Sequence, residues 1–450
     1  MTRSGRPLDA AGTRPVGHPS SDPGQSPKRL RAMELRTLAL ASLGSALEFY
    51  DFIIFVFLTP VIARLFFPTS MPDWVRQAQT FGLFAAGYVV RPLGGLVLAH
   101  FGDMRGRKRV FTASVLLMAI PTLLIGALPT YASIGLGAPL LLLLMRLVQG
   151  LAIGGEAPGA WVFVAEHARP GETGFAVGLL SSGLSSGILL GSLVAIGLNT
   201  AFNAAQVLGG YWRLPFLLGG VLGFVAMLLR RWLSETPVFQ EMQRRAAVSR
   251  AAPLRTVLRS HKPAVVVSIL TTWMLTAAIL IVVLMTPTLL QTLFGVSPKE
   301  ALMANFAGTI AQCVAIAAVG MAADRFGIRR VAVPILLLLI LATYGLYFGA
   351  ERAPHALVPL YVLAGIGAGG AVLTPLVMVR AFPAAIRFTG VSFSYNIGYA
   401  VFGGITPLLV SAMAHWSRLI PAHYVAAVTL LGLISILWAP DARADSHAPD

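Results

Sequence analysis

Two short stretches of this sequence decide its fold, because the second repeats the first in the other half of the chain. Residues 102–108 read Gly-Asp-Met-Arg-Gly-Arg-Lys, and residues 323–330 read Ala-Asp-Arg-Phe-Gly-Ile-Arg-Arg. Both place a glycine three residues after an aspartate and then add basic residues. A second echo pairs residues 169–174 with residues 387–390, each beginning with arginine and ending with glycine. The chain therefore consists of two related halves.

The composition excludes a water-soluble protein. Apolar residues make up 56% of the 450 residues and charged residues only 12%, whereas an average soluble domain has roughly 25% charged residues. A single cysteine, Cys313, excludes a disulfide-stapled chain. The chain is a multi-spanning membrane protein.

The basic residues lie in short clusters rather than on one continuous surface. The formal net charge is +16, from 34 Lys and Arg against 18 Asp and Glu. Nucleic acid needs a contiguous basic face, whereas basic clusters between apolar runs are typical of the positive-inside rule. We therefore expect no nucleic-acid partner.

Twelve apolar segments follow residue 37, and each is long enough to cross a hydrocarbon core as a helix, which takes ~20 residues. The runs are continuous rather than alternating, which excludes transmembrane strands. The expected spans are 38–60, 79–101, 110–129, 138–165, 174–198, 213–232, 264–286, 302–322, 331–349, 356–378, 390–412 and 421–439.

The segments between these spans predict the orientation. With the N-terminus inside, most of the 34 Lys and Arg residues fall on the cytoplasmic side. The opposite side holds only these: Arg64, Arg76, Arg213, Lys299, Arg352 and Arg418. This bias predicts that both termini are cytoplasmic.

A polar, basic segment at the midpoint divides the chain into six plus six helices. The predicted organisation is a disordered cytoplasmic tail (1–37), a six-helix bundle (38–232), a cytoplasmic loop (233–263), a second six-helix bundle (264–439) and a cytoplasmic tail (440–450). The fold class is therefore an all-α membrane protein with two bundles. Two repeated six-helix halves indicate a secondary transporter whose substrate site lies between them.

Further motifs narrow this expectation to one family. They are Glu48-Phe49-Tyr50-Asp51-Phe52, Arg91-Pro92-Leu93-Gly94-Gly95, Arg146-Leu147-Val148-Gln149-Gly150, Gly154-Gly155-Glu156, Glu235-Thr236-Pro237 and Phe382-Pro383 with Arg387 and Gly390. Together with the repeated loops, they resemble the metabolite:proton symporter family of the major facilitator superfamily. The resemblance implies the major facilitator fold and proton-coupled uptake by alternating access.

Three acidic residues inside the expected spans are candidates for proton coupling: Asp51, Glu48 and Glu156. A carboxylate within the membrane costs roughly 2.5–3.5 kcal/mol on insertion scales and by default marks a functional site. Burial disfavours its charged form, which makes the group a usable proton carrier. Glu48 has the alternative of a structural partner for a buried arginine, and Glu156 that of an anchor for the cytoplasmic loops.

Arg91 and Arg146 are the only basic residues in the interiors of the expected spans, away from the span ends, and both are candidates for substrate binding. A guanidinium stays charged and holds a carboxylate through two parallel hydrogen bonds. We expect Asp51 to lie close to Arg91, so that an anion bound to the arginine increases the proton affinity of Asp51. The alternative is a structural ion pair of Arg91 with Glu48 or Asp51.

Uncharged residues complete the expected substrate site. Tyr50 and Gln149 belong to motifs of the first half, and Trp273, Tyr395 and Asn396 belong to the seventh and eleventh spans. No charged residue lies within the spans of the second half. We therefore expect the first half to hold the proton machinery and the second half to give shape and polarity.

The two repeated loops are the expected gating elements. Asp103 is expected to hold the halves together on the cytoplasmic side when the site faces outward; the alternative is a plain anchor of positive charge. The residues assigned to gating are Asp103, Arg105, Gly106, Arg107, Asp324, Arg325 and Gly327.

Two patterns of soluble enzymes lie inside expected spans and are discounted. Residues 365–370 fit a dinucleotide fingerprint but have no preceding strand, so we expect close helix packing through small residues instead. Residues 183–187 fit a hydrolase elbow, which needs a strand–turn–helix setting. No catalytic residue, metal site or cofactor is expected.

The sequence therefore predicts a proton-coupled symporter that imports a small organic metabolite, first of all an organic acid, across the inner (plasma) membrane. The expected partners are the substrate, protons and the lipid bilayer, and the protein is expected to be monomeric. A proton-driven efflux antiporter of the same fold is the alternative, although Gly183, Gly187 and Gly191 without a proline favour symport. An intramembrane serine hydrolase is a more distant one. The identity of the metabolite stays open.

Overall fold

The structure is a computed structural model. It describes residues 27–105, 107–231, 253–414 and 416–439. The predicted tails over 1–26 and 440–450, most of the predicted central loop (232–252) and Gly106 lie outside the described residues. The side chains of Glu48, Asp103, Arg105 and Arg107 also lie outside the description.

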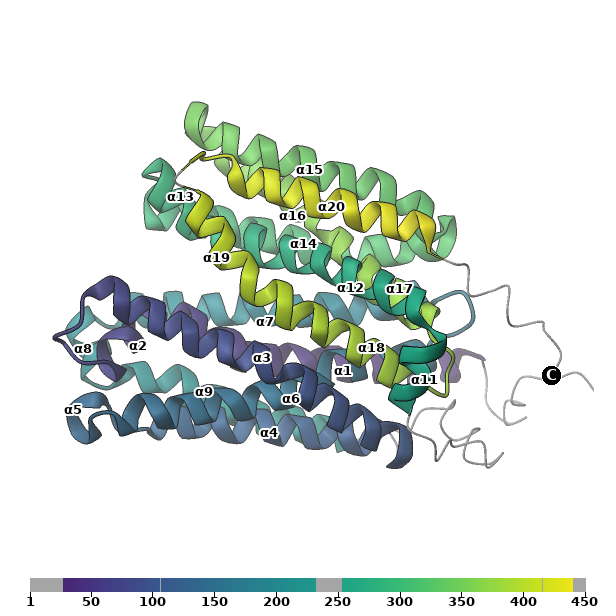
Figure 1. The fold of residues 1–450 in the computed structure, drawn as a ribbon, viewed down its shortest axis with the longest axis horizontal. Coiled ribbons are helices and arrows are strands. Elements are labelled where there is room, and N and C mark those ends of the chain that lie inside the picture. Colours follow the sequence, from purple (N-terminus) through teal and green to yellow (C-terminus); the bar gives the residue numbers. More distant parts are fainter. Residues whose placement is uncertain (1–26, 106, 232–252, 415, 440–450) are drawn as a thin grey trace, which may run out of the picture.

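The first half of the chain forms one bundle of helices, the lower one in Figure 1. Its elements are α1 (Pro27–Phe57), α2 (Thr59–Phe66), α3 (Asp73–Arg105), α4 (Arg107–Ala127), α5 (Tyr131–Ile134), α6 (Gly137–His167), α7 (Thr173–Ala201), α8 (Ala204–Gly209), the 3₁₀ turn η1 (Tyr211–Arg213) and α9 (Leu214–Arg231). Helices satisfy every backbone N–H and C=O within one segment, which an apolar membrane interior requires.

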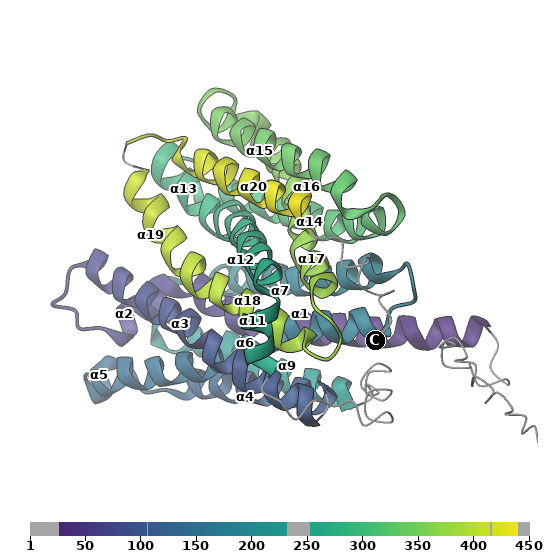
Figure 2. The ribbon, with the colours of Figure 1, turned by 45° about the vertical axis from the view of Figure 1, so that its right-hand side comes forward.

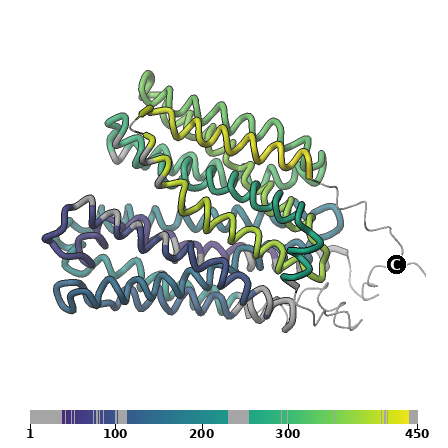
Figure 3. Tube along the Cα trace, in the orientation of Figure 1, coloured from purple at the N-terminus to yellow at the C-terminus, as the bar shows by residue number. Residues whose placement is uncertain are grey.

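The second half forms the upper bundle, as the colour change along the tube in Figure 3 shows. Its elements are α11 (Pro253–Ser260), α12 (Lys262–Thr276), the π-helix η2 (Ala277–Met285), α13 (Thr286–Phe294), α14 (Pro298–Phe326), α15 (Ile328–Arg352), the 3₁₀ turn η3 (Pro354–Ala356), α16 (Leu357–Ala368), the 3₁₀ turn η4 (Gly369–Val372), α17 (Leu373–Ala381), α18 (Arg387–Gly398), the π-helix η5 (Tyr399–Gly403), α19 (Gly404–Met413) and α20 (Ile420–Trp438).

These elements account for all twelve predicted spans once consecutive pieces are joined. By length and apolar composition alone, nine helical runs of the described chain are able to cross a membrane. The apolar parts of α3 and α4 are shorter, at Gly82–Leu98 and Ala113–Ala127. The eleventh span consists of α18, η5 and α19.

Two segments predicted to lie outside the bundles are partly helical. Helix α1 begins at Pro27, so residues 27–37, which the sequence assigned to a disordered tail, are helical. Helix α11 occupies Pro253–Ser260 within the predicted central loop, and α12 already begins at Lys262. In both places, polar and basic residues outside the predicted apolar segment also form helix.

The two bundles meet at one end and separate toward the other. Figures 1 and 2 show α11, α17 and α18 reaching the first bundle at one end, whereas α13 stands away from α2 at the opposite end. We call these the contact end and the far end. Helix α7 packs along α14, and α18 packs against α3 and α6.

Glycines permit the close approach of helices from different halves. A Cβ atom built on Gly174 of α7 would overlap the carbonyl oxygen of Gly320 in α14, and a Cβ on Gly320 would overlap that of Gly174. Small residues let helix backbones approach closely within a membrane. The glycine of the echo at residues 169–174 thus serves helix packing between the halves.

Three spans of the second half are interrupted by η2, η4 and η5, whereas α14, α15 and α20 are continuous. The π-helix η2 is nine residues long, and side chains take up carbonyls within it. Thr286 donates a hydrogen bond to the carbonyl of Ile281 (2.7 Å), Tyr361 to Val282 (2.6 Å) and Asn305 to Val283 (2.8 Å). Such partners stabilise non-α backbone in a membrane protein.

The two enzyme-like patterns lie within helices, as expected. Residues 365–370 fall in α16 and η4, where a Cβ on Gly365 would overlap the backbone of Gly308 and one on Gly369 would lie 2.6 Å from the Cβ of Ala315. Residues 183–187 lie inside α7, so this stretch forms no strand–turn–helix elbow. The expectation of close helix packing at residues 365–370 is confirmed.

Candidate functional site

Arg91 lies buried between the two halves, with only 3% of its surface exposed. The glycines of its motif bring the surrounding helices together. A Cβ on Gly94 would overlap the backbone of Leu151 in α6, and a Cβ on Gly95 would overlap the amide of Asn396 in α18. The motif therefore places a guanidinium where α3, α6 and α18 converge.

Aromatic rings from both halves surround the guanidinium of Arg91. Its Cζ atom lies 5.4 Å from the ring centroid of Tyr88, 5.3 Å from that of Tyr395 and 4.4 Å from that of Tyr399. The indole of Trp161 meets Tyr395 edge to face, with centroids 4.9 Å apart. We call Tyr88, Trp161, Tyr395 and Tyr399 the aromatic cage.

The cage stabilises the charge of Arg91 without using all of its hydrogen-bond donors. Cation–π contacts of this kind contribute about 0.5–2 kcal/mol each, more when desolvated. The Nε atom of Arg91 is buried and has no hydrogen-bond partner among the described residues. An anion in the plane of the guanidinium would satisfy that donor.

Asn396 ties the halves together beside the cage. Its Nδ2 atom donates to the carbonyls of Gly154 in α6 (2.5 Å) and Ser392 (2.8 Å). The hydroxyl of Ser392 donates to the carbonyl of Gly95 in α3 (3.0 Å). The structure therefore joins three predicted site residues, Arg91, Tyr395 and Asn396, at the interface between the halves.

Asp51 lies in a different pocket, formed inside the first half by α1, α4 and α9. Its carboxyl is 1% exposed and faces Gly219 and Gly223 of α9, where a Cβ on Gly219 would lie 2.5 Å from Oδ1. Tyr50 closes this pocket by donating to the carbonyl of Pro215 in α9 (2.9 Å). Two glycines one helical turn apart therefore make room for the carboxyl group.

Neither carboxylate oxygen of Asp51 has a hydrogen-bond partner among the described residues. Thr122 lies beside the carboxyl, but its hydroxyl donates to the carbonyl of Met118 (2.9 Å) and accepts from Gln149 (2.8 Å). The hydroxyl proton of Thr122 is therefore already used. The expected proximity of Asp51 and Arg91 is not found as a direct contact, and no ion pair joins the two.

Arg146 and Gln149 extend a polar chain from α6 toward Asp51. Arg146 Nη1 donates to Gln149 Oε1 (2.8 Å), and Gln149 Nε2 donates to Thr122. The guanidinium of Arg146 also lies over the rings of Phe55 (4.3 Å) and Phe84 (5.2 Å). The structure thus groups Arg146 and Gln149 with Asp51, and Arg146 also lies close to Tyr88 of the aromatic cage.

Two predicted site residues remain, Glu156 and Trp273. Glu156 is buried in α6, with 3% of its surface exposed. Trp273 stacks on Phe402 at 4.0 Å between ring centroids, and its Nε1 atom donates to the hydroxyl of Tyr424 (2.8 Å). Trp273 therefore packs within the second half, outside the aromatic cage.

At the contact end, Asp324 fastens the second half to the first. Its carboxylate accepts hydrogen bonds from the backbone N–H groups of Gly174 (2.7 Å) and Phe175 (2.8 Å), at the start of α7. A helix N-terminus favours such an anion. Arg380 pairs with the same carboxylate at 3.4 Å.

The repeated loop owes its glycine to backbone geometry. Gly327 has φ of +88° between α14 and α15, a conformation that other residues adopt only with strain. Arg325 is exposed and lies over the ring of its neighbour Phe326. Of the gating residues predicted in this loop, Asp324 makes the contact between halves. In the first loop, Gly106 and the side chains of Asp103, Arg105 and Arg107 lie outside the described residues.

A second link at the contact end was missed by sequence reasoning. Arg387 at the start of α18 pairs with Glu166 of α6 at 3.3 Å and donates from Nε to the carbonyl of Phe382 (3.2 Å). Burial lowers the pKa of Arg387, and Glu166 supplies the opposite charge. The sequence did contain a signal for this pair. Glu166 is an acidic residue at the C-terminal end of the fourth span, and Arg387 is the arginine of the second echo.

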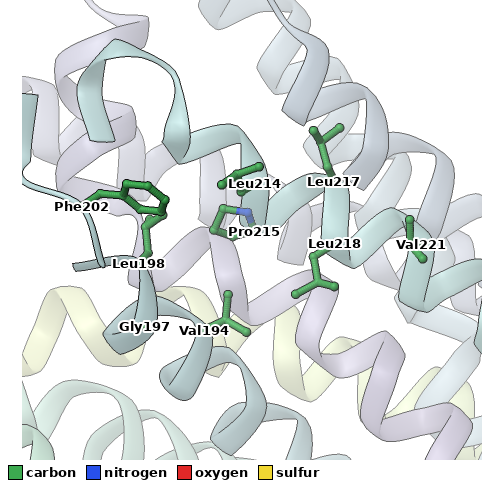
Figure 4. Close-up of a pocket in the computed structure, with 9 residues that line it drawn as sticks. All are labelled: Val194, Gly197, Leu198, Phe202, Leu214, Pro215, Leu217, Leu218 and Val221. Atoms are coloured by element: carbon green, nitrogen blue, oxygen red, sulfur yellow. The ribbon is translucent and has the colours of Figure 1, made fainter. Parts of the chain in front are cut away.

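A groove between α7 and α9 is no candidate for the substrate site. Figure 4 shows its lining of apolar side chains, among them Phe202, Leu214 and Leu218. Its volume is about 460 Å³, and Leu214 and Leu218 are exposed on the outer surface of the bundle. Its lining residues are all apolar or glycine and offer no side chain for an ion. Among the described residues, no group of three His, Cys, Asp or Glu could hold a metal.

Comparisons with known proteins agree with this architecture. The family model for sugar (and other) transporters matches residues 37–264. The chain is 30% identical to a citrate-proton symporter of Klebsiella pneumoniae, over 88% of this chain and 89% of that protein. It is 32% identical to an ectoine/proline transporter of Corynebacterium glutamicum, over 92% of this chain and 84% of that protein.

A solved structure gives the fold. The proton:xylose symporter XylE, bound to 6-bromo-6-deoxy-D-glucose, superposes with a TM-score of 0.77 at 15% identity, covering 92% of this chain and 99% of that one. It is a member of the major facilitator superfamily. Twelve helices in two six-helix bundles therefore describe this chain, as the sequence predicted. The chain belongs to the metabolite:proton symporter family of the major facilitator superfamily, and it is a multi-pass membrane transporter.

Proposed function

We propose that the protein imports a small organic acid together with protons across the inner membrane, by alternating access and without a cofactor or a covalent step. The observation that supports this most is a pair of buried ionisable groups whose hydrogen bonding is incomplete. Asp51 has two carboxylate oxygens without partners, and Arg91 has a free Nε donor. The first can take up a proton, and the second can bind an anion.

Asp51 is the proposed proton carrier. An ionised carboxylate without partners in a low-dielectric interior is unfavourable by several kcal/mol, whereas a protonated one is neutral. Asp51 lies in such surroundings, so we infer that it carries a proton in this conformation. Release of that proton then requires water or a positive charge to reach it when the transporter changes state.

Packed side chains connect the two groups. Asp51 adjoins Thr122, which is linked through Gln149 to Arg146. Arg146 lies over the ring of Phe84, and Phe84 meets Tyr88 of the cage edge to face at 5.0 Å. An anion that repositions Arg91 and Tyr88 would thus act on Arg146 and on the charge that Asp51 experiences. Such coupling is reciprocal in binding free energy.

The contact end is the proposed cytoplasmic side, because the positive-inside rule assigns the loops after α3 and α14 to the cytoplasm. Asp324, Glu166 and Arg387 then hold the cytoplasmic ends of the halves together, which corresponds to a state that opens outward. Both termini would be cytoplasmic, and a single copy would suffice, because the site needs only the two halves of one chain.

Uptake into proteoliposomes tests this function. Purified full-length protein would receive a panel of labelled organic acids under an imposed pH difference. Symport predicts that at least one acid accumulates when the outside is more acidic, and that a protonophore abolishes the accumulation. Accumulation only when the inside is more acidic would assign efflux antiport instead. Equilibration without accumulation would assign a passive facilitator.

A further inference from the structure

We propose that the substrate is a monocarboxylate with an apolar or aromatic body, and that Tyr88, Trp161 and Tyr399 select this body. The proposal rests on the proposed function and names the substrate class of the same site. It follows from how the aromatic cage holds Arg91.

The cage leaves one in-plane donor of Arg91, the Nε atom, without a hydrogen-bond partner among the described residues. A guanidinium has two flat faces, which attract aromatic rings, and an in-plane edge of N–H donors, which matches a carboxylate. Three tyrosine rings lie within 4.4 to 5.4 Å of the Cζ atom of Arg91. Nε, an atom of the in-plane edge, is buried without a partner. One edge of this kind binds one carboxylate.

Among the described residues, a second carboxylate would find no cation beside the cage that is not already engaged. Arg146 lies near Tyr88 of the cage, but it donates to Gln149 and lies over Phe55 and Phe84. Arg380 and Arg387 lie at the contact end, paired with Asp324 and Glu166. A dicarboxylate or tricarboxylate would therefore bury an unpaired charge among the rings, which is strongly unfavourable.

A zwitterion with a quaternary ammonium group fits poorly for a related reason. Aromatic cages attract such groups through their ring faces. In this protein the cation of the cage is Arg91 itself, which the chain supplies. A second cation among the same rings would be repelled by the guanidinium in a medium of low dielectric constant.

The cage also provides a surface for an apolar body. Trp161 comes from α6 and Tyr88 from α3, whereas Tyr395 and Tyr399 come from α18 and η5. Aromatic pairs prefer offset or edge-to-face geometry, and the edge-to-face pair of Trp161 and Tyr395 has this form. Tyr399 lies on a π-helix, a turn that is frequent at functional sites. A ring or branched chain on the substrate would replace one of these ring contacts.

Equilibrium binding to the purified full-length protein in detergent tests the proposal without relying on transport. Labelled benzoate is the probe, and unlabelled succinate, citrate and glycine betaine compete at constant ionic strength. We expect benzoate to bind at least about tenfold more tightly than any competitor. Arg91→Gln should abolish the binding, and Tyr399→Leu should weaken it about tenfold through loss of a ring face. Tyr399→Phe, which keeps the ring, should change it less than threefold.

A matched control separates the cage from general effects of losing a tyrosine. Tyr344 of α15 contacts His423, outside the cage, so Tyr344→Leu should bind benzoate like the unaltered protein. Tighter binding of succinate, citrate or glycine betaine than of benzoate would overturn the proposal. So would equal benzoate binding by the Leu and Phe variants at position 399. In either case, acid-driven accumulation of another organic acid by proteoliposomes would leave the proposed function intact.

Discussion

The two halves share a repeat but divide their properties. In the first half, Asp51, Arg91, Arg146 and Glu156 lie inside the continuous helices α1, α3 and α6. In the second half, the spans hold no charged residue in their interiors, and the seventh, tenth and eleventh are interrupted by η2, η4 and η5. Irregular turns of this kind are frequent at functional sites and hinges.

This difference teaches how a repeated architecture divides two tasks. Buried charges need a fixed environment, because a small displacement leaves them without partners. A helix that contains π or 3₁₀ turns bends more readily, because its hydrogen bonds have poorer geometry. We therefore infer that the first half is the rigid frame for the ions and that the second half supplies the deformable wall.

The largest effect is expected from replacing the buried carboxyl group of Asp51 in the first half. Asp51→Asn should abolish accumulation driven by a pH difference, because the amide cannot carry the proton. With one coupled proton and the membrane potential clamped, one pH unit supports up to about tenfold accumulation, since it is worth ~1.4 kcal/mol. The variant should show none, while counterflow of substrate persists because Asn resembles the protonated acid.

The control for this experiment is Ser45→Ala, a buried polar residue of the same helix. It should retain accumulation. If Asp51→Asn still concentrates substrate against its gradient, the proton carrier is Glu48 or Glu156. The proton site would then lie elsewhere in the first half.

A somewhat smaller effect is expected from the glycines that admit the carboxyl group. Gly219→Ala would place a Cβ atom 2.5 Å from Oδ1 of Asp51 and 2.9 Å from the methyl group of Thr122. Overpacking of this kind costs about 1–3 kcal/mol, so both the melting temperature in detergent and uptake should fall. Gly197→Ala in α7 meets no atom within 4 Å and should change neither. Equal behaviour of the two variants would show that the Asp51 pocket is not tightly packed.

The sequence predicted the spans well and the contacts between them poorly, for one physical reason. A long apolar run reports that a helix is in the membrane, so α6 and α7 end close to the expected positions. The run does not report which helix faces which, so Arg91 was expected beside Asp51 and the pairing of Asp51 with Gly219 was missed. Spacing also does not reveal a π-helix, because η5 has the same kind of residues as its neighbours.

The contact end allows a comparison of the two repeated loops. Asp324→Asn should weaken the hold on the start of α7, because an amide replaces a charged acceptor of two N–H groups. Charge-assisted hydrogen bonds contribute about 1.5–3 kcal/mol. The amide oxygen of the Asn side chain retains one acceptor. We therefore expect the equilibrium between the closed and the open contact end to shift by about 1–2 kcal/mol, or roughly 5–30-fold in population. Asp103→Asn in the same assay measures how much the first repeated loop contributes to holding the contact end closed.

Labelling of a buried cysteine measures this shift. Ala176 is 1% exposed at the seam between the halves, so Ala176→Cys in a Cys313→Ser background should label faster when the contact end opens. Glu351→Gln is the matched control, because Glu351 forms an exposed ion pair with Arg418 and such pairs contribute little. Labelling rates that do not differ between Asp324→Asn and the control would remove Asp324 from the gate.

The smallest effect is expected at Trp273, which the sequence assigned to substrate binding. Trp273→Phe keeps a ring against Phe402, loses the hydrogen bond to Tyr424 and replaces the indole by a smaller ring. A neutral hydrogen bond contributes about 0.5–1.5 kcal/mol, so the melting temperature should fall by no more than about 1–3 °C. The KM for uptake should change less than about twofold, because Trp273 lies outside the aromatic cage. A KM raised about tenfold with an unchanged melting temperature would instead place the substrate against the wall of the second half and would extend the site beyond Arg91.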